Sequence, residues 1–291
     1  MSKPKILLQL DTDEQPSVFD SVVALDAGAD HLLRQHSITA DNVRDQVHGA
    51  IFTRGPGDLH HTAIFIGGSN VAAAEAVLAE VRRTFFGPMR VSVMLDPSGA
   101  NTTAAAAVAA AGKHLALRDT TAVVLAATGP VGQRAVRLLA LEGAALRVVS
   151  RRLERARAVC DAVTARYPAA KIVAARASSE EETIASLSDA ALVIATGAAG
   201  VELASSEALR RAGSLKVAID LNAVPPAGLG GVEVMDRGAE RAGVICYGAV
   251  GVGGVKMKIH KRAIQRLFET NDQVLDAEEL YAIAVGMRDE G

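Results

Sequence analysis

Residues 122–132, Ala122-Val-Val-Leu-Ala-Ala-Thr-Gly-Pro-Val-Gly132, give the strongest indication of how this chain folds. It begins as a short apolar run typical of a buried strand, passes through a turn with two glycines, and leads into a segment of helical composition. At the N-terminus of a helix the first backbone N–H groups lack partners within the helix, and together with the helix dipole they attract anions. A strand, a glycine turn and a helix in this order therefore predict a phosphate-binding turn.

The same turn matches the dinucleotide-binding pattern G-x-G-x-x-G at two of its three glycines. Gly129 and Gly132 match, whereas Ala127 stands at the first glycine position. The glycines alone would also suit an ordinary connection between a strand and a helix. In this context we interpret them as a dinucleotide site. We expect the residues that bind the cofactor here to be Thr128, Gly129, Pro130, Val131 and Gly132.

The residues after the next predicted strand indicate which dinucleotide binds. They are Ser150, Arg151 and Arg152, and none is the carboxylate that holds the ribose 2′-hydroxyl in NAD-binding proteins. Two guanidinium groups can bind a 2′-phosphate, so we expect NADP as the cofactor, with NAD as the other candidate. The alternative interpretation is a solvated helix face, and we adopt it for Arg155 and Arg157.

Apolar runs of strand length alternate with alanine-rich segments of helical length along the chain. Runs that are apolar throughout are typical of strands buried on both faces, and helices between them indicate parallel crossovers. We predict strands at residues 6–10, 63–66, 91–95, 122–126, 146–149, 171–175, 191–195, 216–221 and 244–247, and helices at residues 71–84, 102–115, 131–142, 153–166, 180–187, 207–212 and 277–287. The expected fold class is α/β, with a Rossmann-type doubly wound parallel sheet.

A turn-rich segment at residues 97–103 suggests a boundary between two domains. We expect residues 1–100 to form an N-terminal α/β domain that binds the substrate, joined by a C-terminal helix within residues 270–291. Residues 101–269 would form the NADP-binding Rossmann domain.

Polar residues follow several predicted strands. Thr196, Gly197 and Asn222 follow two strands of the second domain, and Asp11 and Asp13 follow the first strand of the chain. Ligands of parallel sheets bind beyond the carboxyl ends of the strands. We therefore expect the first three residues to line the nicotinamide half of the cofactor site, although they would also suit simple connections.

Composition and charge exclude several classes of function. The 291 residues carry 31 Lys and Arg against 33 Asp and Glu, and only 3% are aromatic, so we expect no nucleic-acid partner. The longest segments without a charged residue, 59–74 and 97–112, fall short of the roughly 20 apolar residues of a membrane span. Two cysteines and scattered histidines predict neither a disulfide framework nor a metal site. Since no signal segment precedes the first strand, we expect a cytoplasmic protein without membrane partners.

With these features in place, the chain resembles a known enzyme family. The segments that carry the resemblance span the chain in this order: Asp11–Asp13, Pro16–Asp20, Phe85–Pro88, Asn101–Ala105, Thr128–Gly132 and Gly251–Lys258. Together they look like the NAD(P)-dependent methylene-tetrahydromethanopterin dehydrogenases of bacterial one-carbon metabolism and methylotrophy. The resemblance implies a two-domain subunit in a homo-oligomer, such as a trimer, with a reduced pterin in a cleft facing the nicotinamide. It implies oxidation of N5,N10-methylene-tetrahydromethanopterin to the methenyl cation.

Alternative functions stay open at this point. Some relatives accept the tetrahydrofolate analogue, so a methylene-tetrahydrofolate dehydrogenase is the alternative enzyme. A shikimate-dehydrogenase-like enzyme would need a Lys/Asp proton-transfer pair, which we cannot place in this sequence. A non-catalytic NADPH-binding protein would carry the same phosphate turn.

Two lysines follow Gly251–Gly254, a segment that we expect to form a glycine-rich turn. In a helix Lys256 and Lys258 would lie about 200° apart, so only one of them can face a ligand. The family pattern implies that Lys256 is the catalytic residue, in the sense that it orients the pterin. Without that pattern both lysines would suit the surface of a basic helix, on which we also place His260.

The resemblance implies that the pterin also contacts Asp11, Asp13, Asn101 and Thr102. The two carboxylates would accept hydrogen bonds from the pterin, and their alternative role is a Mg²⁺ site. Asn101 or Thr102 would also suit the cap of the alanine-rich helix, and the two roles are compatible. Loss of hydride from a carbon between two nitrogens needs no general acid or base, so we predict no catalytic dyad. The enzyme has to align that carbon with nicotinamide C4 and exclude water.

Overall fold

The computed structural model describes residues 3–289, which form two compact units. Among these residues, unit 1 comprises 3–102 and 257–289, and unit 2 comprises 103–256. The first division falls within helix α4 (Ala100–Ala111) and the second within helix α9 (Ala249–Arg266). The second division therefore follows residue 256, inside a helix, whereas we predicted from the sequence that the Rossmann domain ends at residue 269.

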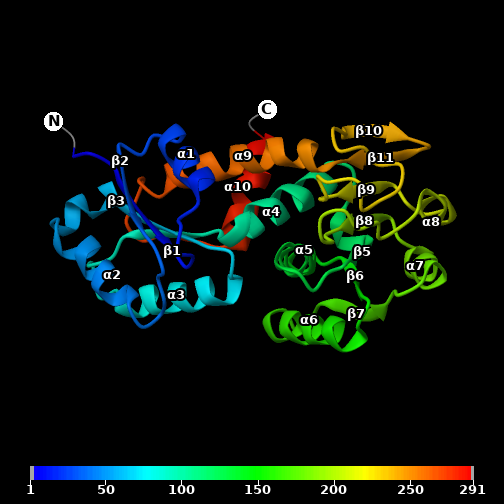
Figure 1. Cartoon of the computed structure of the whole chain (residues 1–291), viewed down its shortest axis with the longest axis horizontal. Helices are drawn as coiled ribbons and strands as arrows, with labels where there is room; N and C mark the ends of the chain where they lie inside the picture. The colour runs from blue at the N-terminus through cyan, green and yellow to red at the C-terminus, as the bar shows by residue number, and fades with distance from the viewer. Residues whose placement is uncertain (1–2, 290–291) are drawn as a thin grey trace. The chain divides into compact units, whose positions relative to one another are not determined.

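Unit 1 is built on a parallel five-stranded sheet in the order β12-β4-β3-β1-β2. Its strands are β1 (Ile6–Asp11), β2 (His31–Gln35), β3 (Thr62–Gly67), β4 (Ser92–Leu95) and β12 (Val274–Leu275), and its own helices are α1 (Val18–Asp26), α2 (Val43–Phe52), α3 (Val71–Thr84) and α10 (Ala277–Asp289) (Figure 1). This is the strand order of flavodoxin-like doubly wound sheets, in which the order reverses between the first and third strands. The carboxyl ends of β1 and β3 are therefore the expected place for a ligand in this unit.

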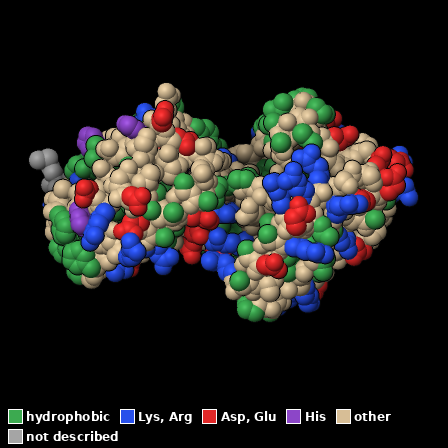
Figure 2. Space-filling model, turned by 60° about the horizontal axis from the view of Figure 1, so that its bottom comes forward, with side chains coloured by type: hydrophobic (Ala, Val, Ile, Leu, Met, Phe, Trp, Pro, Cys, Tyr) green, Lys and Arg blue, Asp and Glu red, His purple; other side chains and the backbone are tan. Residues whose placement is uncertain are grey.

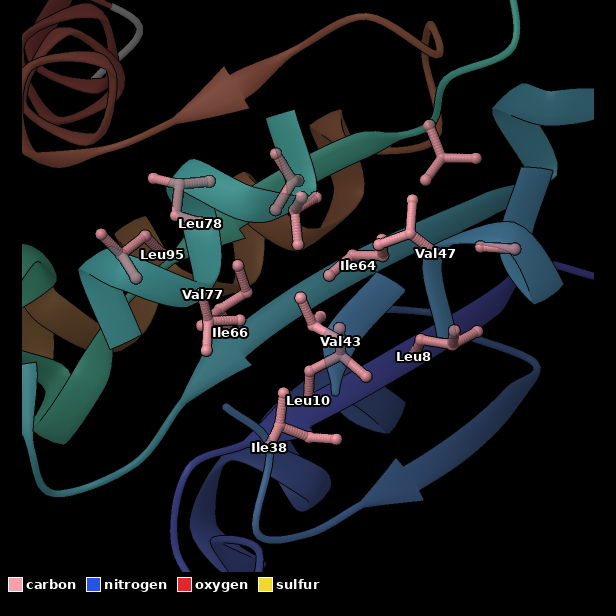
Figure 3. Packing of buried hydrophobic residues seen from close by; sticks show 14 of the residues in the cluster. Leu8, Leu10, Ile38, Val43, Val47, Ile64, Ile66, Val77, Leu78 and Leu95 are labelled. Carbon is pink, nitrogen blue, oxygen red and sulfur yellow. The ribbon is translucent and has the colours of Figure 1, made fainter. Parts of the chain in front are cut away.

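The core of unit 1 lies between this sheet and helices α2 and α3 (Figure 3). Its buried side chains include Leu8, Leu10, Val43, Val47, Ile64, Ile66, Val77, Leu78 and Leu95. Burial of an aliphatic side chain of this size contributes about 1.5–3 kcal/mol. The two inner strands are thereby fixed, and the residues at their carboxyl ends are held on a rigid base.

Unit 2 contains a seven-stranded sheet in the order β10-β11-β9-β8-β5-β6-β7, parallel except for β10. Its strands are β5 (Thr121–Leu125), β6 (Ala145–Ser150), β7 (Lys171–Arg176), β8 (Leu192–Ala195), β9 (Val217–Asp220), β10 (Arg237–Arg241) and β11 (Val244–Tyr247), and its helices are α5 (Pro130–Leu141), α6 (Leu153–Arg166), α7 (Glu180–Leu187) and α8 (Ser206–Arg211). The order from β7 to β11 is that of a Rossmann sheet, which reverses between β5 and β8. A dinucleotide is expected at that reversal.

The predicted α/β fold is confirmed, and the predicted strands and helices are all present with ends shifted by a few residues. The sequence reasoning did not identify α1, α2, β2, β10 and β12. Strand β2 lies at the edge of its sheet with largely exposed side chains, so it lacks the continuous apolar run that marks an inner strand. The part of helix α9 that precedes Lys256 was not predicted, because its glycines were interpreted as a turn.

Two further features concern residues 3–289. Cys160 and Cys246 are both buried free thiols. No helix in this range combines the length and the apolar character needed to cross a bilayer.

Candidate active site

The phosphate turn joins β5 to α5 at the reversal point of unit 2. Ala126 has a φ of 55°, and Gly129 is the N-cap of α5 with an extended backbone. Pro130 follows in the first turn of the helix, where its missing N–H removes no intrahelical hydrogen bond. No described side chain caps this helix N-terminus. Its backbone N–H groups therefore suit an anionic ligand.

Gly132 allows α5 to pack closely against the end of the β5 turn. A Cβ atom at Gly132 would lie 2.6 Å from Thr196 Oγ1, 2.7 Å from Ala127 Cα and 2.8 Å from the Ala127 carbonyl carbon. Ordinary contact begins at 3.4 Å, so only glycine fits between these atoms. This is the role of the third glycine in the dinucleotide-binding pattern. Ala127 is fully buried at the first glycine position, and its methyl group is accommodated there.

A cavity of about 760 Å³ opens beside this turn, within unit 2. It is lined by the ends of β5 and β6 and by the segments that follow β7 and β8. Five of the predicted cofactor residues line it: Thr128, Ser150, Arg151, Arg152 and Gly197. The others are not among the described residues of its wall: Gly129, Pro130, Val131, Gly132, Thr196 and Asn222. The first four of these build the adjacent turn and helix start.

The positive charge of the cavity comes from the segment that follows β6. Ser150 is buried, and its hydroxyl oxygen accepts a hydrogen bond of 3.2 Å from the backbone N–H of Arg152. Arg151 and Arg152 are exposed and line the cavity, and so does Arg155 from the first turn of α6. Arg155 therefore lies on the exposed face of α6, as predicted, and also in the wall of the cavity. In Figure 2, Lys and Arg side chains gather on the face of unit 2 turned toward the viewer, with acidic side chains among them.

Thr196 and Gly197 follow β8 and support the phosphate turn. The Thr196 hydroxyl donates to the carbonyl oxygens of Leu125 and Ala126, at 2.9 and 3.2 Å. A Cβ atom at Gly197 would lie 2.9 Å from a methyl group of Leu203, so a larger residue would push on the cavity wall. Both residues thus hold the turn and the cavity in shape.

Asn222 organises the loop after β9 through its side chain. Its amide nitrogen donates to the Pro226 carbonyl at 2.9 Å, and its amide oxygen accepts from the backbone N–H of Val224 at 3.0 Å and of Gly200 at 3.4 Å. The Asn222 backbone N–H donates to the carboxylate of Asp220 at 3.0 Å. Burial raises the pKa of Asp220 despite such backbone hydrogen bonds.

In unit 1 the two predicted carboxylates stabilise two different turns. Asp11 is buried at the end of β1, and its carboxylate accepts from the backbone N–H groups of Asp13 and Ser17 at 3.0 and 3.1 Å. Asp13 accepts from the backbone N–H and the hydroxyl of Ser69, both at 2.9 Å, on the loop after β3. The pair therefore joins the carboxyl ends of β1 and β3. No group of three or more His, Cys, Asp or Glu side chains within residues 3–289 is placed to hold a metal ion.

Asn101 and Thr102 are fully buried in the first turn of α4, and the cap of that helix is Asp96. The Asp96 carboxylate accepts from the backbone N–H groups of Asn101 and Thr102, at 2.9 and 3.0 Å, and from the Thr102 hydroxyl at 2.6 Å. The Asn101 amide nitrogen donates to the Leu95 carbonyl and to Asp276 at the start of α10. The prediction that Asn101 or Thr102 is the cap was wrong, because the helix begins earlier, at Ala100.

Lys256 lies in the middle of α9, and the glycines that precede it are helical. The predicted turn at Gly251–Gly254 was wrong, because α9 begins at Ala249 and Gly251 packs directly against the Asp236 carbonyl, where no Cβ fits. Lys256 is half-buried and Lys258 is exposed, as expected for residues on opposite sides of a helix. The prediction of a surface position for His260 was also wrong, because its side chain is fully buried.

Three features were not predicted from the sequence: the position of Arg155 in the cavity wall, the capping of α4 by Asp96 and the burial of His260. Asp96 precedes Pro97, and an Asp-Pro pair before a helical segment is typical of a helix start. His260 belongs to an apolar stripe with Ile259 and Ala263, but the lysines and arginines between them suggested a surface helix. Arg155 lies one turn after Arg152, a spacing that puts both side chains on one helix face.

Comparison with known proteins gives matches along the whole chain. Residues 18–98 match the family described as methylene-tetrahydromethanopterin dehydrogenase, N-terminal. The chain is 45% identical over 289 residues to the bifunctional protein MdtA of Methylorubrum extorquens, covering 99% of this chain and all of that protein. It is 32% identical over 290 residues to the NAD(P)-dependent methylenetetrahydromethanopterin dehydrogenase of the same organism, covering 96% of this chain and 97% of that enzyme.

The fold is also similar to that of a solved structure, the quinate dehydrogenase from Corynebacterium glutamicum in complex with NAD. The TM-score is 0.51 at 14% sequence identity, over 98% of this chain and all of the other. At this identity the likeness concerns the fold alone. With the two full-length relatives, the chain belongs to the family of NAD(P)-dependent methylenetetrahydromethanopterin dehydrogenases.

Proposed function

We propose that this protein is an oxidoreductase that transfers a hydride from N5,N10-methylene-tetrahydromethanopterin to NADP and releases the methenyl cation. NAD is the second cofactor candidate. The observation that carries this proposal is the 32% sequence identity to an enzyme named for this reaction, over 97% of the length of that enzyme. The phosphate turn and the cavity beside it support the proposal from the geometry of unit 2.

The residues of unit 2 fit a phosphorylated dinucleotide. The close packing at Gly132 brings the start of α5 against the phosphate turn, and the cavity of about 760 Å³ lies beside it. The backbone from Thr128 to Gly132 would hold the pyrophosphate, and Ser150, Arg151 and Arg152 would hold the 2′-phosphate. Thr196, Gly197 and Asn222 are assigned to the nicotinamide half. When bound, the cofactor supplies the carbon atom that accepts the hydride.

The pterin is assigned to the carboxyl ends of the unit 1 strands and to Lys256. Asp11 and Asp13 each accept two hydrogen bonds already, and an ionised carboxylate has room for further donors such as a pterin amino group. Lys256 would bind a carbonyl or the anionic tail of the pterin, away from the reacting carbon, because a nearby cation would disfavour the forming methenyl cation. Asn101 and Thr102, which are also assigned to the pterin, are fully buried in the first turn of α4 and would support its site from behind.

The chemical step needs orientation more than proton transfer. The C–H bond of the methylene carbon breaks and its electron pair leaves with the hydride, while the lone pairs of the two flanking nitrogens stabilise the cation that remains. No proton moves in this step, so no general acid or base is required. The protein contributes by holding the two reacting carbons about 3–3.5 Å apart and by excluding water.

The remaining properties are proposed on the same basis. We assign the protein to the cytoplasm, as a homo-oligomer such as a trimer, without nucleic-acid or membrane partners. Its near-balanced charge and low aromatic content support the absence of a nucleic-acid surface. The preferred carrier is tetrahydromethanopterin, with tetrahydrofolate as the carrier against which it is tested.

The test is a comparison of two pterins and two cofactors in one assay. The purified protein is mixed with methylene-tetrahydromethanopterin or methylene-tetrahydrofolate and with NADP or NAD, and the absorbance of reduced nicotinamide is followed. The proposal expects the highest kcat/KM with methylene-tetrahydromethanopterin and NADP. Reduction with the folate alone, or tight NADPH binding without reduction by either pterin, would contradict it.

A further inference from the structure

His260 is a polar side chain in the fully buried part of α9, and the chemical step described above does not use it. Its ring stacks on Phe65 of β3, with ring centroids 5.5 Å apart and an angle of 15° between the planes. Its Nδ1 lies 4.0 Å from the nearer oxygen of Asp96 at the end of β4. All three side chains belong to unit 1 and are at most 1% exposed.

Asp96 is a fixed reference point for this ring. Its carboxylate is held by two backbone N–H groups and one hydroxyl at the start of α4, at 2.6–3.0 Å. Phe65 is also held in place, because its strand, β3, lies in the middle of the sheet between β4 and β1. Phe65 and Asp96 therefore give the ring of His260 a defined position within unit 1.

The rotation of α9 decides which lysine faces a ligand. Lys256 and Lys258 are separated by about 200° around the helix, and the structure leaves the first half-buried and the second exposed. Lys256 and His260 are four residues apart, so they lie on the same side of the helix in successive turns. The two side chains therefore share one face of α9.

Helix α9 is also held in place on the N-terminal side of Lys256. Five residues earlier, Gly251 packs against the Asp236 carbonyl so closely that a Cβ atom has no room. Val252 is buried next to it. Lys256 thus stands between two fixed points of one continuous helix, and of these two only His260 carries a polar side chain.

We propose that His260 is a positioning residue for Lys256: its stacking on Phe65 beside Asp96 sets the rotation of α9 that directs Lys256 toward the pterin. A leucine of similar size would fill the same space but would lack the polar ring, and in some proteins a single buried polar group fixes one register among several. This inference rests on the proposed function, since it assumes that Lys256 binds the pterin.

The experiment is a double-mutant cycle with Lys256→Ala, His260→Leu and the combined variant. For each protein, kcat and KM for methylene-tetrahydromethanopterin and Kd for NADP are measured. We expect His260→Leu to lower kcat/KM for the pterin on the order of 10- to 100-fold when Lys256 is present, and by no more than about 2-fold in the Lys256→Ala background. Kd for NADP stays within about 2-fold in all variants, because neither Lys256 nor His260 belongs to the phosphate turn or to the wall of the cavity beside it.

Two controls separate positioning from general destabilisation. Ile264→Ala removes a fully buried side chain of α9 and lowers the melting temperature, but its kcat/KM for the pterin stays at the wild-type value. Lys258→Ala, the matched lysine variant, also stays at the wild-type value. Where His260→Leu does not fold, His260→Gln takes its place in the cycle.

The results distinguish the inference from the function on which it rests. An equal loss from His260→Leu with and without Lys256 would overturn the positioning role while leaving the function intact. A wild-type kcat/KM for Lys256→Ala would overturn the role of both residues. Absence of hydride transfer in the wild-type protein, with NADP still bound, would refute the proposed function itself.

Discussion

Gly132→Ala is the substitution whose effect follows most directly from the geometry of the cofactor site. The added methyl group would lie 2.7 Å from Ala127 Cα and 2.6 Å from Thr196 Oγ1, whereas ordinary contact begins at 3.4 Å. The start of α5 therefore has to move away from the phosphate turn by about 0.7 Å. Both obstructing groups are fixed, since one is backbone and the other is the Thr196 hydroxyl bonded to the carbonyls of Leu125 and Ala126.

Two consequences are expected from this displacement. Overpacking of a tight contact costs about 1–3 kcal/mol of folding stability. Binding of NADP weakens on the order of 10- to 100-fold, because the backbone N–H groups that hold the pyrophosphate shift with the helix. The measurements are Kd for NADP by fluorescence titration and the melting temperature without cofactor.

Gly49→Ala is the matched control. Gly49 lies in α2 of unit 1, is exposed, and would place its Cβ atom within 4 Å of no other described atom. Alanine is the better helix former by about 1 kcal/mol, so this variant is expected to be as stable as the wild type or more stable, with unchanged NADP binding. Wild-type affinity for NADP in Gly132→Ala would refute the assignment of this turn to the cofactor.

Three further predictions concern charged side chains. Arg151→Ala is expected to weaken NADP about 10- to 100-fold and NAD far less, because a charge-assisted hydrogen bond to the 2′-phosphate is lost; equal losses in the two dissociation constants would sink the NADP assignment. Lys256→Ala is expected to lower kcat/KM for the pterin at least about 10-fold with Kd for NADP unchanged, and unaltered steady-state kinetics would remove Lys256 from the site. Asp236→Asn is expected to cost about 1–3 kcal/mol near neutral pH, since the Arg241 guanidinium hydrogen-bonded to Asp236 lowers the pKa of that carboxyl from its ordinary value of 3.8. A carboxyl whose pKa is lowered by folding stabilises the fold at pH values above its ordinary pKa, and this stabilisation is lost as the pH falls through its pKa in the folded protein. Denaturant titrations should therefore show the free energies of unfolding of Asp236→Asn and of the wild type converging below about pH 4, and a constant difference would contradict this.

The fold was largely predictable because both sheets have inner strands that are apolar throughout. Runs such as Val123–Leu125 and Ala63–Ile66 are fully buried, and their pattern differs from that of any surface strand. Strand β2 was not predictable in this way, since an edge strand has little buried surface to mark it. Helix α9 was obscured by Gly251, which looks like a turn residue in the sequence and is required instead by a packing contact distant in the chain.

The cofactor turn was predictable because its chemistry is local. Strand, glycine turn and helix follow one another in sequence, and the arginines that line the same cavity come at the end of the next strand. The unit 1 residues were harder, because their partners lie far away along the chain. Asp13 contacts Ser69 beyond the paired strands β1 and β3, and the ring of His260 in α9 stacks on Phe65 and lies 4.0 Å from Asp96. No local spacing in the sequence reveals these neighbours.

Direct transfer of hydride between the pterin and the cofactor is the central claim, and isotope transfer tests it directly. The protein is mixed in ordinary water with methylene-tetrahydromethanopterin that carries deuterium at both methylene positions and with NADP, and the reduced cofactor is analysed by mass spectrometry. We predict one deuterium at nicotinamide C4 in every reduced molecule, because the transferred hydrogen does not exchange with water. Reduced cofactor that carries hydrogen from water, or no reduced cofactor at all, would contradict the claim.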